Sequence, residues 1–100
     1  MSPEADRLLA QSGIQVVEAQ SHYMLVRGEC VVLVERTPSG PGSAGSTGVM
    51  TANGLAFLVT REGGDMLAAK GSLTAATPEQ VQAIRAFSAD VKSILDKTRF

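Results

Sequence analysis

The residues with the clearest potential for chemistry form a run of small side chains that spells two nucleotide-binding patterns. The stretch from Gly40 to Thr47, GPGSAGST, satisfies the dinucleotide fingerprint GxGxxG and follows an apolar run that starts at Cys30. It also fits the phosphate-loop pattern GxxxxGK[ST], except that Ser46 stands where lysine is required. Either site would hold its phosphate groups at a helix N-terminus, where unpaired N–H groups favour an anion.

The residues that follow this run argue against a nucleotide site. Nine residues separate Gly45 from Leu55, and they include two glycines, two threonines and the pair Asn53-Gly54. A crossover between parallel strands needs about 10–12 residues including its helix, so no amphipathic helix fits there. We therefore interpret residues 37–48 as a flexible, solvent-exposed strand connection within one domain that spans residues 1–100.

A mobile binding loop is the functional alternative for this connection, because long loops in compact domains often carry function. Backbone N–H groups would close over a small molecule or an anion, and a nearby arginine would supply the counter-charge. The candidate residues for such a site are Arg36, Gly42, Ser43, Gly45 and Arg61.

The chain is poor in groups that catalyse reactions at neutral pH. It has one histidine, His22, at the start of a predicted strand, and one cysteine, Cys30, inside an apolar run where we expect a buried thiol. A single cysteine excludes an intramolecular disulfide and a thiolate cluster for a metal. The carboxylates are spread singly, and no GxSxG nucleophile motif occurs. We expect no enzyme activity, no cofactor and no metal site.

Composition limits the partners further. The 100 residues are 44% hydrophobic and 19% charged, with a net charge of −1, which is typical of one globular domain. This balance provides no basic face for nucleic acid. The longest apolar runs are far too short to span a bilayer, and the N-terminus lacks the order of a signal peptide. The sequence therefore predicts a cytoplasmic protein that binds neither nucleic acid nor membrane.

Local signals predict two helices at the two ends of the chain. Ser2 is a candidate N-cap, Pro3 suits the first helical position and Gly13 ends the first helix. Thr77 to Gln80 form a capping box that starts a longer helix. The apolar stripe of this second helix consists of Val81, Ile84, Phe87, Val91, Ile94 and Leu95.

Between the helices the sequence predicts an antiparallel meander of five or six short strands. Asn53-Gly54 is a two-residue hairpin signal, although a single bulged strand could also pass through it. The fold class is therefore α+β: a short N-terminal helix, a meander interrupted by a long Gly/Ser loop, and an amphipathic C-terminal helix packed on the sheet. The predicted strands are 14–19, 22–27, 30–36, 49–52, 55–61 and 66–70.

Two predicted strands are apolar on both faces, which is the main indication of function. In the third strand Val31 and Leu33 point away from Val32, and in the fifth Ala56 and Leu58 point away from Phe57. A strand with one wet face would alternate between apolar and polar residues. Two helices can cover one face of such a sheet, so we expect a second chain on the other, with Val31, Leu33, Ala56 and Leu58 as interface candidates.

These observations favour a non-enzymatic protein-interaction module, a small dimeric adaptor or chaperone-like protein that uses an apolar sheet face or a strand edge. We expect a homodimer, and exposed edges also invite strand addition by a second copy, another protein or a peptide. The order of elements is loosely similar to that of small acidic secretion chaperones, although this chain lacks a helix between its two strand groups. The alternative is the small-molecule or anion-binding domain described above.

Overall fold

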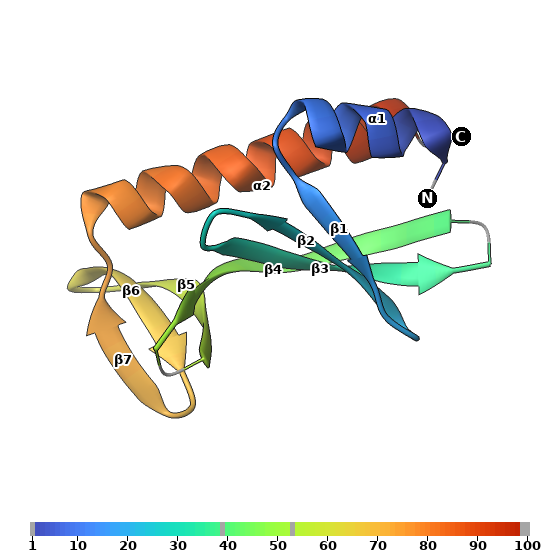
Figure 1. The fold of residues 1–100 in the computed structure, drawn as a ribbon. Helices are drawn as coiled ribbons and strands as arrows, with labels where there is room; N and C mark the ends of the chain where they lie inside the picture. Colours follow the sequence, from blue (N-terminus) through green and yellow to red (C-terminus); the bar gives the residue numbers. More distant parts are fainter. Residues whose placement is uncertain (1, 39, 53, 99–100) are drawn as a thin grey trace.

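A computed structural model describes residues 2–38, 40–52 and 54–98 as two helices and one antiparallel sheet (Figure 1). It confirms the α+β class, the meander and the C-terminal helix packed on the sheet. Within the described residues the sheet has seven strands, where five or six were predicted, in the order in which they follow along the chain. The elements are α1 (Pro3–Gln11), β1 (Gln15–Glu18), β2 (His22–Arg27), β3 (Cys30–Thr37), β4 (Gly40–Thr51), β5 (Gly54–Arg61), β6 (Gly64–Ala69), β7 (Ser72–Ala75) and α2 (Pro78–Thr98).

Both helices begin with the predicted caps. The Ser2 hydroxyl accepts a hydrogen bond from the Ala5 N–H at 3.2 Å, and Pro3 is the first residue of α1. At the start of α2, Thr77 Oγ1 accepts from the Gln80 N–H at 3.1 Å while Gln80 Oε1 accepts from the Thr77 N–H at 2.9 Å. This reciprocal pair satisfies two N–H groups that the first helical turn would leave without a partner.

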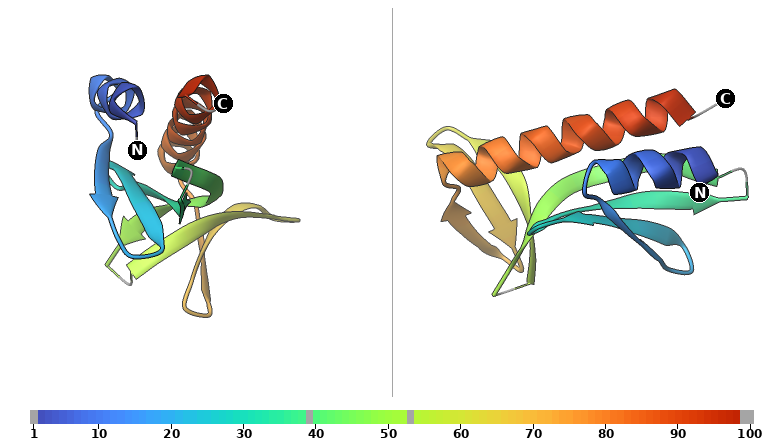
Figure 2. Two further views of the ribbon diagram at one scale, coloured as in Figure 1. Left: turned by 90° about the vertical axis from the view of Figure 1, so that its right-hand side faces the viewer. Right: turned by 45° about the horizontal axis from the view of Figure 1, so that its top comes forward.

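The two helices lie side by side on the same face of the sheet (Figure 2). Val32 and Val34 on β3, together with Leu25 on β2, are 2% exposed or less beneath them. The α2 stripe buries Ile84, Phe87, Val91, Ile94 and Leu95 in the same cluster, as predicted. We call this helix-covered side the inner face and the opposite side the outer face. No described element covers the outer face.

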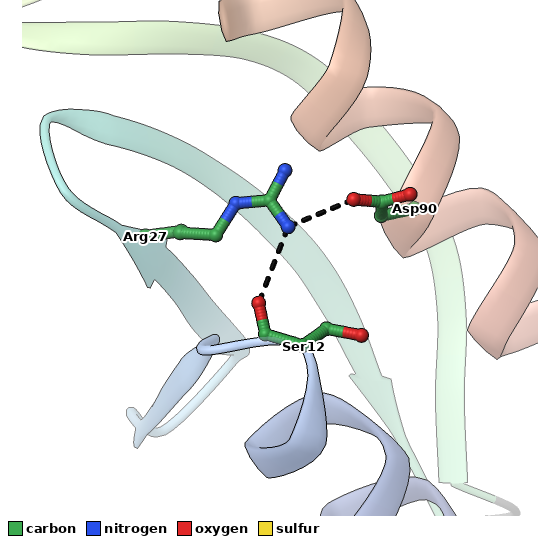
Figure 3. Close-up of polar contacts among 3 residues, drawn as sticks. All are labelled: Ser12, Arg27 and Asp90. Carbon is green, nitrogen blue, oxygen red and sulfur yellow. Dashed lines mark hydrogen bonds and ion pairs between the residues drawn. The ribbon is translucent and has the colours of Figure 1, made fainter.

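Arg27 joins the sheet to both helices (Figure 3). Its Nη1 donates to the Ser12 carbonyl at the end of α1 (3.2 Å) and to Asp90 Oδ2 on α2 (2.8 Å). The guanidinium also lies 5.3 Å from the centroid of the Phe87 ring, which is within cation–π distance. One side chain of β2 thus positions both helices over the inner face.

The prediction of a flexible loop at 37–48 is wrong. Gly40–Thr51 is the longest strand, β4, which pairs with β3 from Cys30↔Val49 to Thr37↔Gly40. The glycines in it serve close packing: a Cβ on Gly42 would lie 3.1 Å from Glu35 Cβ, and one on Gly45 would lie 3.3 Å from the Leu33 carbonyl oxygen. Small residues are needed there because the backbone of β4 runs tightly against β3.

The strand boundaries after β4 also differ from the prediction. Residues 49–52 are not a separate strand, because Val49 to Thr51 form the end of β4. β5 starts at Gly54, and Asn53 of the predicted hairpin turn lies outside the described residues. Ser72–Ala75, which no sequence signal marked, forms β7 through its pairing with β6.

Candidate protein-interaction surface

An uncharged row of residues crosses the outer face from β2 to β7. Residues directly opposite in an antiparallel pair point to the same face, so the register identifies the members of the row. Val31 of β3 pairs with Val26 on one side and with Gly48 on the other, and Gly48 pairs with Phe57. From β2 to β7 the row is Val26, Val31, Gly48, Phe57, Ala68 and Leu73, and the polar Gln15 of β1 pairs with Val26 at its end.

Four exposed large hydrophobic side chains lie on this same outer face. They are Val17 (47% exposed), Leu33 (37%), Met50 (48%) and Leu73 (50%). Val17 and Leu33 both pair with Met24, and Met50 pairs with Leu55, which shares its face with Phe57. Exposed apolar side chains gathered on one face are typical of an interaction site, whereas scattered ones are ordinary.

Gly48 shapes the centre of the face. A Cβ at this position would lie 3.2 Å from Cδ1 of Phe57, so the ring occupies the space that a larger residue would need. The neighbouring Val31 is only 3% exposed, although it belongs to the outer face and lies outside the inner core cluster. The outer face is therefore packed at its centre and open toward its margins.

The structure divides the four predicted interface residues between the two faces. Val31 and Leu33 lie on the outer face. Ala56 (2% exposed) pairs with Val49 in the inner core, and Leu58 is half-buried against that core. The outward residues of β5 are instead Leu55, Phe57 and Val59. Alternation in the sequence separates the residues of each strand into two faces. Only the register through β4 shows which residues of β3 and β5 lie on the same face of the sheet.

The predicted ligand-binding residues are brought together in part. Ser43 and Gly45 line one shallow outer-face hollow with Arg36. Arg36 also donates from Nη1 to the Ala19 carbonyl (3.0 Å) and lies 5.6 Å from the Tyr23 ring centroid. Gly42 and Arg61 do not line this hollow, and Arg61 ends β5. Because Gly42, Ser43 and Gly45 are strand residues, a loop that closes over a ligand has no structural basis here.

The cysteine and the histidine of the chain lie in different environments. Cys30 is buried (6% exposed), and burial raises the pKa of its thiol although Arg27 acts in the opposite direction. His22 Nδ1 and Ser21 Oγ are hydrogen-bonded at 2.8 Å on the exposed surface. Within the described ranges no group of three or more His, Cys, Asp or Glu side chains could hold a metal ion.

Neither of the two described helices is long and apolar enough to cross a bilayer. In comparisons with known proteins, no family model, no curated protein and no solved structure matches the chain.

Proposed function

We propose that the protein is a non-enzymatic interaction module that dimerises through the outer face of its sheet. The observation that carries this proposal is the uncharged row across β2–β7 on a face that no described element covers. In a two-layer domain that face would be expected to meet water and to carry alternating polar residues. An apolar face of this extent is stabilised when a second surface removes it from water.

The exposed area of the chain supports an interface of ordinary size. A folded monomer of this mass exposes about 5,400 Å² of surface, whereas this chain exposes 6270 Å². The excess of roughly 900 Å² follows from an elongated shape, and a standard interface would take ~800 Å² from each partner. The molecule is also elongated, with extents of 41 × 24 × 22 Å.

A second copy fits this surface better than a strongly charged partner does. The net charge of −1 means that two copies meet without appreciable repulsion. At the described strand positions of the outer face, the charged residues Glu35 and Arg61 stand near strand ends and leave the centre apolar. A twofold dimer buries the same patch on both subunits, so one self-complementary face is sufficient.

Sedimentation velocity at about 50 µM tests the proposal. We expect the wild-type chain to sediment at twice its monomer mass and the variant Met50→Glu/Leu73→Glu to sediment as a monomer. Both changed side chains are about half exposed, so charge can be placed there without disturbing the core. The matched control is Ala89→Glu, an exposed alanine on α2, which leaves the dimer intact. A monomeric wild-type protein, or a dimeric double variant, contradicts the proposal.

A further inference from the structure

The sheet has an open strand edge in its middle. β4 pairs with β3 along most of its length but with β5 only from Gly48 to Thr51. Beyond Phe57 the register of β5 continues with β6 alone. Residues 43–47 of β4, which we call the open edge, therefore have a described strand neighbour on one side only. Figure 1 shows β4 extending well past its short contact with β5.

A hollow lies between the open edge and α2 on the inner face. Its volume is about 320 Å³. Ala44 and Thr47 of β4 line it on one side, and Ser88 of α2 on the other, while Val32, Val91 and Leu95 supply buried apolar surface. Because Val32, Val91 and Leu95 form its floor, an aliphatic side chain placed in this hollow would contact apolar surface.

A second hollow lies beside the same edge on the outer face. Leu33 and Phe57 supply its apolar lining, and Ala44 and Gly45 border it along β4. Its volume is about 750 Å³. The small side chains of β4 thus leave space on both sides of one strand edge.

From this arrangement we infer that the open edge binds a short, extended, uncharged segment of a partner protein by strand addition. Successive side chains of a strand point to opposite faces, so neighbouring residues of an added strand would enter the inner and the outer hollow in turn. Main-chain hydrogen bonds to β4 would provide affinity, and the two hollows would provide selectivity for aliphatic side chains.

Charge at the two hollows favours a neutral segment. The inner hollow is lined by one cation and one anion, Lys92 and Asp96, and the outer hollow by Arg36 and Glu35. Neither hollow therefore attracts a segment of one charge sign. The site is also short. One register shift, between Pro41 and Ala44, limits regular pairing on the N-terminal side, and the other, between Ala44 and Thr47, lies within the open edge itself.

Selection from a phage-displayed library of random peptides of about nine residues, at the long end of ordinary strand lengths, tests this inference on the intact protein. We expect enriched peptides with aliphatic residues at two neighbouring positions, one for each hollow, and no net charge. Bound to ¹⁵N-labelled protein, such a peptide should shift and protect the amides of residues 43–47. Failure to enrich any peptide, enrichment of charged peptides, or amide changes confined to β1 or β7 overturns the inference.

Two serines on α2 provide the matched variants. Ser88→Phe places a ring in the inner hollow and should weaken binding of the selected peptide by at least about tenfold. Ser93→Phe adds the same ring at another exposed position of α2 and should leave the affinity unchanged. Equal affinity for the two variants contradicts the site. The Met50→Glu/Leu73→Glu variant should still bind the peptide, so failure of the proposed dimer and failure of this edge site are measured separately.

Discussion

At the scale of single residues, Gly48 has the least room for a side chain among the described glycines. It pairs with Val31 on one side and with Phe57 on the other, so three strands meet at it. A Cβ there would collide with the Ala56 carbonyl oxygen and press on the Phe57 ring. Backbone cannot yield as a flexible side chain can, and the strands would have to separate.

We therefore expect Gly48→Ala to lower the free energy of unfolding by about 1–3 kcal/mol, the usual cost of overpacking. The measurement is urea unfolding followed by circular dichroism. Gly63→Ala is the control, because no atom lies within 4 Å of a Cβ built there, and its effect should stay within about 0.5 kcal/mol. Equal unfolding midpoints for the two variants would show that β4 and β5 do not approach as closely as described.

At the scale of elements, the capping box of α2 stabilises the protein through hydrogen bonds within the first turn of the helix. Thr77→Ala removes the hydroxyl that accepts from the Gln80 N–H and should cost about 1 kcal/mol of stability. Thermal unfolding by calorimetry measures this loss. Ser93→Ala, an exposed position inside the same helix, should cost nothing, because alanine is the better helix former. A Thr77→Ala variant as stable as Ser93→Ala would show that the capping box contributes nothing.

The same scale shows what the sequence could predict and what it could not. Both helices were predictable because their caps and apolar stripes are signals within one turn or two. β4 was not, because Gly, Ser and Pro have low strand propensity and its extended form depends on pairing with the distant β3. Which residues share one face of a strand was predictable, as Val31 and Leu33 of β3 show. That they share a face of the sheet with Phe57 and not with Ala56 could be seen only from the strand register through Gly48.

At the scale of the whole molecule, folding and association should be one linked equilibrium. Two helices cover one face of a seven-stranded sheet within the described residues, and the other face lies open. If a second copy covers that face, the dimer is favoured by mass action and its melting temperature depends on protein concentration. A monomer has no such dependence.

We expect the midpoint of thermal unfolding to rise by about 4–8 °C when the protein concentration rises about a hundredfold. Differential scanning calorimetry at two concentrations measures the shift. Met50→Glu/Leu73→Glu should melt at one temperature at both concentrations, because its charged side chains keep the outer faces apart. This comparison separates dimerisation from aggregation, since aggregation of unfolded chains would affect wild type and variant alike. A wild-type melting temperature that is the same at both protein concentrations would contradict dimerisation through the outer face.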